Sequence, residues 1–359
     1  MKILITAPNL DVKRNVSGIS TVVRQIIEYG RAEYVHFVTG RADGEKKGLV
    51  WVMRQFALPF NFCGVLKREK PDIVHINTAF TGLAIVRDAA LILVVRAVGI
   101  PRVLAIHGGR YLMADISCAF LYAVAGWMLR EAGIVLVLSE IEKESIERRW
   151  ADVNVEILPN AVPTGKVRIK GRDLEPPNIV FLGRFHESKG LGELVEASKD
   201  LASSPQRFNV TAFGDGPERA SFVSAMSEIL GDRFEYGGVA DDTYKWTVMA
   251  NADIFVLPSR YGEGLPMAML EAMASGCIVI VSDNASVSSV VKDGDNGFLV
   301  APGNAQELKK VIENVLRTKG DWPAIRMSAM KTVAERFTIE KYVDRLEGHY
   351  STLLQKKPK

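Results

Sequence analysis

The sequence predicts an α/β protein of two domains, each built on a doubly wound parallel sheet. Three observations support this fold class. A chain of 359 residues is longer than one compact core usually extends. Short runs rich in β-branched residues alternate with helical stretches, which is typical of parallel sheets covered by helices. The alternation also restarts after a polar stretch at 163–178, which contains Pro163, Pro176 and Pro177.

The first half of the chain is expected to form the N-terminal domain, residues 1–165. Its buried strands are expected at KILITAP, YVHFVTG, DIVHIN, RVLAIHG, IVLVLS and VEILPNA. Helical periodicity or helix-favouring composition marks the stretches 18–29, 59–69, 81–98, 115–131 and 140–149. Each helical stretch lies between two of these strands, so the strands can pair in parallel.

The second half repeats the pattern and predicts a C-terminal domain over 178–338. Its expected strands are NIVFLGR, FNVTAFG, RFEYGGV, DIFVLPS, CIVIVSD and GFLVA. The last helical segment, 339–354, is expected to fold back onto the first domain. Two such domains would face a central cleft, in which ligands bind beyond the carboxyl ends of the strands.

Composition restricts the partners and the location of the protein. A formal net charge of +3 is too small to favour nucleic acid. Cys63, Cys118 and Cys277 are far apart and match no disulfide or metal pattern, which favours a reducing compartment. The opening MKILITAPNLD is typical of a strand and turn rather than of a signal peptide. The apolar run 116–129 is shorter than the roughly 20 residues of a membrane-spanning helix. We therefore expect a cytoplasmic protein.

Two carboxylates lie in an otherwise apolar stretch, SRYGEGLPMAMLEAMASG, at 259–276. Glu271 falls within an expected buried helix, where an ionised side chain is costly unless another group bonds it. Glu263 lies between Gly262 and Gly264, which allow the backbone to approach a ligand closely. Free N–H groups at the start of the helix favour an anion or a sugar oxygen. The alternative is structural: a buried salt bridge from Glu271 to an arginine, and an ordinary loop glutamate at 263.

Other polar side chains lie at further expected strand ends. Arg184 and Lys189, in GRFHESKG after the first strand of the second domain, suit a diphosphate, although a solvated surface pair has the same pattern. In NVSGIST, Ser17 and Gly18 precede a helix, which indicates either a ligand-binding loop or an N-cap turn. His107 ends the strand RVLAIH before two glycines, so its imidazole is expected to point into the cleft.

In their order along the chain, these motifs resemble the retaining family 4 glycosyltransferases, which have the GT-B fold. The resemblance rests on a glycine loop after the first strand, a strand ending in histidine, GRFHESKG, GDGP, ADIFVLPS and an E-x7-E motif within EGLPMAMLEAMASGCIVIVSD. It is strongest from residue 178 to about 300. The first loop departs from the family, which commonly has two consecutive glycines where this chain has Ser17 and Gly18. The GT-B fold implies two Rossmann-like domains that face a central cleft.

The resemblance implies a role for each site residue. Glu271 would accept hydrogen bonds from ribose hydroxyls, and Glu263 would hold hydroxyls of the donor hexose. Arg184 and Lys189 would neutralise the diphosphate, and His107 would contact the sugar near the reacting carbon. The other substrate-binding positions act through backbone or loop contacts to the base, the sugar or the phosphates, and are Ser17, Gly18, Gly238, Val239, Gly264, Leu265 and Met267.

Neither a cofactor nor a catalytic metal is expected. GDGPER, at 214–219, begins like a dinucleotide-binding fingerprint, but Arg219 replaces the third glycine. Asp293 and Asp295 have the D-x-D form of metal-dependent glycosyltransferases, yet their context KDGDNG is typical of a turn. The two cations of GRFHESKG would serve the diphosphate in place of a metal ion.

The predicted activity is transfer of a hexose from a UDP- or GDP-linked sugar to a saccharide or lipid-linked acceptor, with retention of configuration. Surface polysaccharide or glycolipid synthesis is the expected context. Two alternatives remain: another GT-B enzyme with glycogen-synthase-like or phosphorylase-like activity, and a non-catalytic protein that binds nucleotide sugars. The resemblance favours front-face attack, because a double displacement needs a carboxylate nucleophile and Glu263 would instead bind hydroxyls.

The segment 46–70 mixes basic with bulky apolar residues, a composition that suits an anionic bilayer surface. Its basic residues are Lys46, Lys47, Arg54, Lys67, Arg68 and Lys70, and its aromatic residues are Trp51, Phe56, Phe60 and Phe62. The alternative is a helix pair packed on the sheet with a solvated basic edge. Pro59 is expected to interrupt any single long helix here. Peripheral binding to the inner face of the plasma membrane is therefore a further hypothesis.

Overall fold

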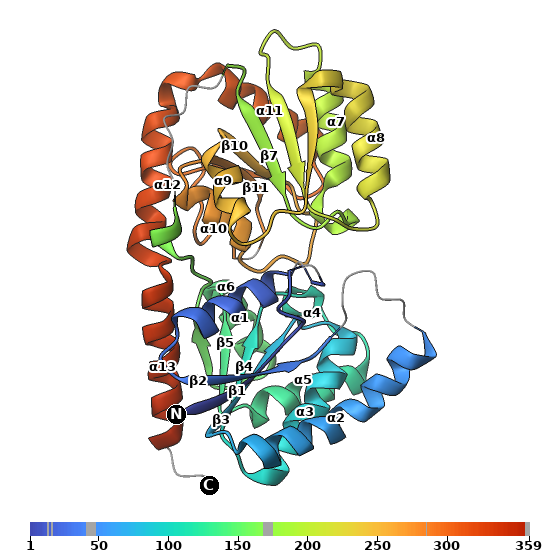
Figure 1. Ribbon diagram of the computed structural model, residues 1–359, viewed down its shortest axis with the longest axis vertical. Helices are drawn as coiled ribbons and strands as arrows, with labels where there is room; N and C mark the ends of the chain where they lie inside the picture. The colour runs from blue at the N-terminus through green and yellow to red at the C-terminus, as the bar shows by residue number, and fades with distance from the viewer. Residues whose placement is uncertain (13, 16, 41–47, 168–174, 285, 356–359) are drawn as a thin grey trace. The chain divides into compact units, whose positions relative to one another are not determined.

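The computed structural model describes residues 1–12, 14–15, 17–40, 48–167, 175–284 and 286–355, except for the side chains of 49 and 50. The chain divides into two compact units. One contains residues 1–160 and the stretch from Glu340 onward, and the other contains Ala161–Ile339. Each unit has its own sheet, labelled in Figure 1.

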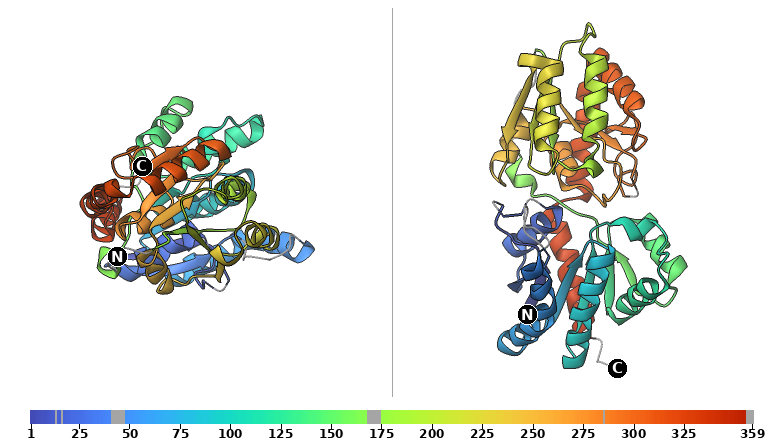
Figure 2. Two further views of the ribbon diagram at one scale, coloured as in Figure 1. Left: turned by 90° about the horizontal axis from the view of Figure 1, so that it is seen from above. Right: turned by 90° about the vertical axis from the view of Figure 1, so that its right-hand side faces the viewer.

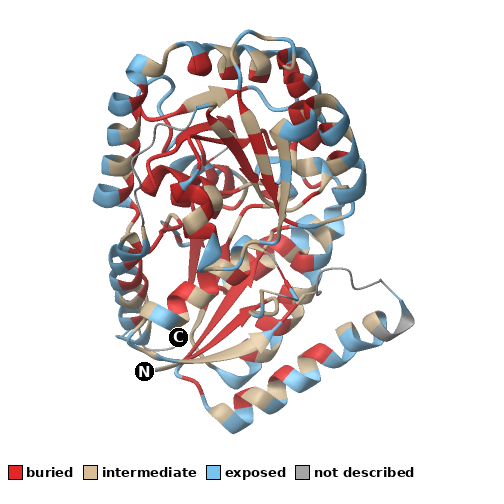
Figure 3. Ribbon diagram, turned by 45° about the horizontal axis from the view of Figure 1, so that its top comes forward, coloured by how far each residue is buried: buried red, intermediate tan, exposed pale blue. Residues whose placement is uncertain are grey.

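The sheet of the N-terminal unit has six strands in the order β2-β1-β3-β4-β5-β6. These strands are β1 (Lys2–Ala7), β2 (Glu33–Val38), β3 (Ile73–Thr78), β4 (Arg102–Ile106), β5 (Ile134–Val137) and β6 (Val155–Ile157). All neighbouring pairs run parallel. All six residues of β3 are buried, as expected of a central strand in a parallel sheet covered on both faces (Figure 3).

The N-terminal unit also contains the helices α1 (Gly18–Tyr29), α2 (Leu49–Glu69), α3 (Gly82–Val98), α4 (Arg110–Met113), α5 (Ala119–Glu131), α6 (Glu140–Arg149) and α13 (Ile339–Gln355). α3 packs against both α2 and α5. The expectation that Pro59 interrupts a long helix was wrong, because α2 continues through it. A proline costs the helix one backbone hydrogen bond. Leu58, Phe62 and Leu66, which are buried on one face of α2, offset that cost by packing in the core.

The last helix, α13, packs on the N-terminal unit through a buried tyrosine. Tyr350 is fully buried, and its hydroxyl lies 2.6 Å from Nδ1 of His75 on β3. At the surface, Arg31 donates hydrogen bonds to Asp344 and Glu347 of α13. The helix is therefore attached by both buried and exposed polar contacts.

The C-terminal unit repeats the architecture with the strand order β12-β11-β10-β7-β8-β9. Its strands are β7 (Asn178–Leu182), β8 (Asn209–Phe213), β9 (Phe234–Gly238), β10 (Ile254–Leu257), β11 (Ile278–Ser282) and β12 (Phe298–Val300), all parallel to their neighbours. Its α-helices are α7 (Leu191–Leu201), α8 (Arg219–Leu230), α9 (Tyr244–Ala250), α10 (Met267–Ala274), α11 (Ala305–Arg317) and α12 (Trp322–Arg336). α7 lies between α8 and α11 (Figure 2). The predicted fold class, two doubly wound parallel sheets, is confirmed.

Within the described ranges, no helix is long and apolar enough to cross a bilayer.

Candidate active site

The site residues of the C-terminal unit follow three strands of one sheet. Arg184 lies two residues beyond β7, Glu263 lies in the loop after β10, and Gly238 ends β9. β10 is paired with β7, and only β8 separates β7 from β9. Because the carboxyl ends of parallel strands meet at one edge, residues distant in the sequence are brought together there.

Lys189 and Glu263 form an ion pair between two of these loops. Lys189 ends a short 3₁₀ turn, Glu187–Lys189, and its Nζ donates to Oε1 of Glu263. The hydroxyl of Ser259 donates to the same oxygen over 2.7 Å. The predicted phosphate-binding cation and the predicted hexose-binding carboxylate are thus neighbours, and Oε1 of Glu263 is already bonded twice.

The loop that carries Glu263 is attached to the loop that carries Lys189. Arg260 Nε donates to Glu193 over 2.5 Å, and the Tyr261 hydroxyl donates to Glu187 over 2.5 Å. Close backbone approach requires Gly190, where φ is +71° and a Cβ would lie 1.9 Å from the carbonyl oxygen of Pro258. The relative position of Lys189 and Glu263 is therefore defined by several contacts besides their own bond.

Glu271 is buried in α10, and Nζ of Lys245 on α9 lies 2.5 Å from its Oε1. Nζ of Lys245 also lies 3.0 Å from Oδ1 of Asp242. Burial alone would lower the pKa of Lys245, but the two carboxylates outweigh burial, and the pKa of Lys245 is raised. The buried salt bridge weighed as an alternative therefore exists, with a lysine in place of the expected arginine. It leaves Oε2 of Glu271 outside the Lys245 contact.

The remaining predicted positions of this unit lie around these carboxylates. α10 begins at Met267, because Pro266 has extended backbone and serves as the N-cap. Gly264 and Leu265 are buried just before it. Gly238 has a φ of +78°, and Val239, which follows it, is 45% exposed.

The predicted positions of the N-terminal unit lie at the start of α1 and just beyond β4. Ser17 is the N-cap of α1 and accepts a hydrogen bond from the Ser20 N–H, so the N-cap alternative describes its local role, and Gly18 is the first helical residue. His107 follows β4, and its Nε2 lies 2.6 Å from Oδ1 of Asn77 on β3. Burial lowers the pKa of His107 to about 4, so the imidazole is neutral near pH 7.

Two family models match this chain, one in each half. "Glycosyl transferase 4-like domain" matches residues 17–161, and "Glycosyl transferases group 1" matches residues 166–332. The chain belongs to the group 1 glycosyltransferases.

Curated relatives of this glycosyltransferase act on different molecules. The 2-deoxystreptamine glucosyltransferase of Streptomyces kanamyceticus is 28% identical over 73% of this chain and 73% of its own length. The amylovoran biosynthesis glycosyltransferase AmsK of Erwinia amylovora is 29% identical over 48% of this chain and 44% of its own length.

Solved structures support the fold of this glycosyltransferase. Sucrose-phosphate synthase from Thermosynechococcus elongatus superposes with a TM-score of 0.82 at 19% identity, over 99% of both chains. HepE of Anabaena, solved in complex with UDP-glucose, superposes with a TM-score of 0.78 at 19% identity, over 98% of this chain and 100% of that one. Both structures establish the two-sheet GT-B architecture here.

Three residues that the sequence does not single out contact predicted site residues, each within its own unit. Lys245 neutralises Glu271, Ser259 bonds Glu263, and Asn77 bonds His107. A signal existed for two of them. Lys245 lies beside Trp246 in an otherwise apolar helical stretch, and Asn77 is a polar residue at the end of the buried strand DIVHIN.

The D-x-D sequence of this glycosyltransferase lies in a turn, as expected. Oδ1 of Asp293 accepts from the Leu299 N–H, and Oδ1 of Asp295 accepts from the Ser328 hydroxyl. Over the ranges that the structure describes, no group of three or more His, Cys, Asp or Glu side chains could hold a metal ion.

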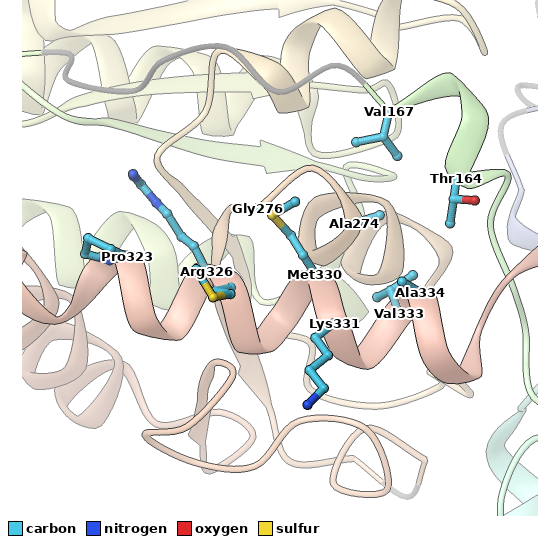
Figure 4. A pocket seen from close by; sticks show the side chains of 11 residues that line it. Thr164, Val167, Ala274, Gly276, Pro323, Arg326, Met330, Lys331, Val333 and Ala334 are labelled. Carbon is cyan, nitrogen blue, oxygen red and sulfur yellow. The ribbon is translucent and has the colours of Figure 1, made fainter.

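A hollow of about 670 Å³ lies at the end of α10 and along α12 (Figure 4). Its walls are mostly apolar, and Ala274, Gly276 and Met330 are among the lining residues. Neither Lys189 nor Glu263 lines it. The hollow is therefore separate from the paired loops.

Proposed function

We propose that this glycosyltransferase moves a hexose from a nucleoside diphosphate sugar to a saccharide or lipid-linked acceptor, with retention of configuration. The observation that carries the proposal is the Lys189–Glu263 pair at adjoining strand ends, with Arg184 beside it in the sequence. Cations suited to a diphosphate and a carboxylate suited to sugar hydroxyls thus share one site. HepE, which has the same fold, was solved with UDP-glucose.

In this proposal the donor lies along the strand ends of the C-terminal unit. Arg184 and Lys189 neutralise the diphosphate, and Glu263 binds hexose hydroxyls. Glu271 accepts from the ribose hydroxyls, while Lys245 supplies its counter-charge in the apolar helix. The backbone of Gly238 and Val239 approaches the base, and the buried backbone of Gly264, Leu265 and Met267 lies near the sugar and phosphates. In the N-terminal unit, Ser17 and Gly18 provide a loop at the start of α1, and His107 provides an imidazole for the sugar.

The proposed reaction is a front-face displacement. The bond between the anomeric carbon and the β-phosphate oxygen breaks, the acceptor oxygen bonds the same face of that carbon, and the acceptor proton passes to the departing phosphate. Glu263 is not the nucleophile in this proposal, because it binds hexose hydroxyls, and the Ser259 hydroxyl holds its Oε1. Stabilisation of the phosphate by two cations is then the main catalytic contribution, and neither a metal ion nor another cofactor is required.

Surface polysaccharide or glycolipid synthesis is the context that we propose, in line with the name of the AmsK relative. A cytoplasmic location, with peripheral contact to the inner face of the plasma membrane, belongs to the same proposal. Of the segment 46–70, Lys46 and Lys47 lie outside the described residues. Phe56 and Phe60 of α2 are 75% and 80% exposed, and the predicted basic edge continues with the exposed Lys67.

A thermal-shift screen of UDP- and GDP-linked hexoses tests the donor. A ligand at 100 times its dissociation constant stabilises the protein by about 2.7 kcal/mol, which raises the melting temperature measurably. Each stabilising donor is then incubated with the protein without an acceptor. NMR follows the release of free hexose and identifies the anomer that forms first. Release of the same anomer as the donor supports retention, and release of the opposite anomer contradicts it. Binding without turnover, even with added saccharide acceptors, would indicate a non-catalytic binding protein. A visible pyridoxal absorbance would indicate a phosphorylase.

A further inference from the structure

Asn77 and His107 form a partly buried hydrogen bond between β3 and the end of β4 in the N-terminal sheet. Asn77 is 2% exposed on β3, and its Oδ1 lies 2.6 Å from Nε2 of His107, just beyond β4. A neutral imidazole has one N–H donor and one lone-pair acceptor. Which nitrogen of His107 carries the proton therefore depends on whether the amide oxygen or the amide nitrogen of Asn77 faces the ring.

The amide of Asn77 can take only one orientation. Its Nδ2 donates to the carbonyl oxygen of Thr6 on β1 over 2.9 Å, and a carbonyl can only accept. The backbone N–H of Asn77 also donates to the Thr6 hydroxyl over 3.1 Å, so the two residues are bonded twice. With Nδ2 facing Thr6, the atom that faces His107 is the amide oxygen. An amide oxygen is also an acceptor, so Nε2 of His107 must carry the hydrogen.

We propose that Asn77 is a positioning residue, which holds His107 as the neutral Nε2–H tautomer and leaves Nδ1 as the ring atom for a substrate hydroxyl. Nδ1 of His107 is buried and has no hydrogen-bond partner within the described part of the chain. A lone pair that the protein leaves unused can accept a hydrogen bond from a ligand. The contact of His107 with the sugar rests on the proposed function, whereas the tautomer and its dependence on Asn77 do not.

The tautomer can be measured directly on the full chain by ¹H–¹⁵N NMR of ¹⁵N-histidine-labelled protein at neutral pH. The chain has five histidines, and loss of one set of ring signals in His107→Gln assigns His107. We expect a proton on Nε2 and none on Nδ1 in the wild-type protein. A proton on Nδ1 overturns the proposal.

Asn77→Leu removes the amide oxygen and nitrogen with no change in the number of non-hydrogen side-chain atoms. The ring signals of His107 should then report a mixture of tautomers, and a ring that stays wholly in the Nε2–H form overturns the role of Asn77. Thr78→Val is the matched control on the same strand. Thr78 is equally buried, and its hydroxyl has no hydrogen-bond partner in the described chain, so the His107 signals should not change. If Asn77→Leu does not fold, Asn77→Ala provides the same comparison with space for water.

Kinetics with a donor found in the screen, for example UDP-glucose, test which nitrogen the substrate uses. Asn77→Leu should lower kcat about 10- to 100-fold, by analogy with losing a group that orients a metal-binding histidine. The affinity for UDP should not change, because the nucleotide binds the other unit.

His107→Asn places an amide near Nδ1 and His107→Gln places one near Nε2, so the Asn variant should retain more turnover. The opposite order overturns the assignment of Nδ1. If no donor binds wild-type protein, the proposed function fails, while the NMR result still decides the tautomer.

Discussion

Lys189 and Glu263 are bonded to each other although 74 positions separate them in the sequence. Their loops meet because β10 is paired with β7 in the sheet. In the absence of a donor, each charge is the counter-ion of the other. A donor diphosphate has to compete with Glu263 for Lys189, and the Ser259 hydroxyl remains to hold the carboxylate when Lys189 turns to the phosphate.

Removal of either predicted phosphate cation should therefore slow turnover and preserve the fold. We expect Arg184→Ala and Lys189→Ala each to lower kcat by about 10²-fold or more, by analogy with loss of an oxyanion-stabilising donor. Both side chains are only partly buried, so the melting temperature should change little. Steady-state rates of donor hydrolysis measure the effect.

Lys199→Ala is the matched control for these cations. Lys199 is an exposed lysine of α7, on the helix that follows Lys189, and its loss should leave kcat unchanged. Near-wild-type rates in both Arg184→Ala and Lys189→Ala would remove the diphosphate assignment.

Replacement of Glu271 should weaken nucleotide binding. Glu271→Gln keeps the shape of the side chain but loses the charge, and we expect a loss of roughly 1.5–3 kcal/mol in binding free energy, the scale of a charged hydrogen bond. Isothermal titration with the free nucleoside diphosphate measures it. The 2′-deoxy and 3′-deoxy nucleotides should lose less binding free energy on the same substitution, because each lacks one of the hydroxyls that would donate to Glu271.

A structural role for Glu271 alone predicts a different outcome. The Lys245–Glu271 pair is buried, so breaking it also destabilises the unit. Unchanged nucleotide affinity together with a lowered melting temperature would leave only the salt bridge. The double variant Lys245→Met/Glu271→Gln separates the two effects, since it also removes the buried lysine that has lost Glu271, and it should recover stability without recovering affinity.

Most of the fold follows from local patterns in the sequence. The runs that form β3, β10 and β11 are rich in β-branched residues, and their parallel pairing follows from the helices between them. The site residues could be placed at strand ends for the same reason. Contacts between loops could not be predicted in this way. The pairing of Lys189 with Glu263 depends on β10 lying beside β7, and the order of strands in a sheet does not follow from the spacing of residues in the sequence.

Local rules also failed where packing overrides them. Pro59 indicates the end of a helix by its chemistry, yet α2 continues because its buried face contributes more than one lost hydrogen bond costs. The roles of Lys245 and Asn77 could not be predicted locally, because each depends on a partner from another element. The partner of Lys245 is on α10, and the partner of Asn77 follows β4.

Acid should destabilise the N-terminal unit through His75. Burial lowers the pKa of His75 to about 3, with a smaller effect from His107, whereas an unfolded histidine titrates near 6.5. The unfolded chain therefore binds the proton first as the pH falls. The contribution to stability is fully present above about pH 6.5 and is lost toward pH 3, at up to about 1.4 kcal/mol per pH unit. The depressed pKa of His107 acts in the same direction.

Urea unfolding of wild-type protein and of His75→Gln across this range checks the sign. Gln is uncharged throughout and can accept from the Tyr350 hydroxyl, so the variant should lose less stability on acidification. An equal slope in both proteins would show that His75 is not buried in its neutral form. Tyr350→Phe, which removes only the hydroxyl, should cost about 1 kcal/mol at neutral pH without changing the acid slope appreciably.

The exposed face of α2 gives the last prediction, binding to anionic membranes. Met53, Phe56 and Phe60 are 64%, 75% and 80% exposed, and their spacing of three and four residues places them on one side of the helix. Arg54 is exposed beside them. Aromatic rings can enter the bilayer interface while nearby cations meet anionic headgroups, so we expect the protein to float with anionic vesicles at low salt and much less at high salt.

Two sets of substitutions separate the apolar from the electrostatic contribution to this binding. Phe56→Ser/Phe60→Ser should reduce flotation at every salt concentration, whereas Lys46→Glu/Lys47→Glu/Arg54→Glu should reduce the salt-sensitive part, by about 1 kcal/mol for each basic residue near the surface. Met327→Ser is the control, because Met327 is an equally exposed apolar residue of the other unit. Hydrolysis of the donor without acceptor should be unchanged in all of these variants, since none touches the donor site. Absence of the wild-type protein from anionic vesicles at low salt would contradict membrane binding and favour a soluble acceptor.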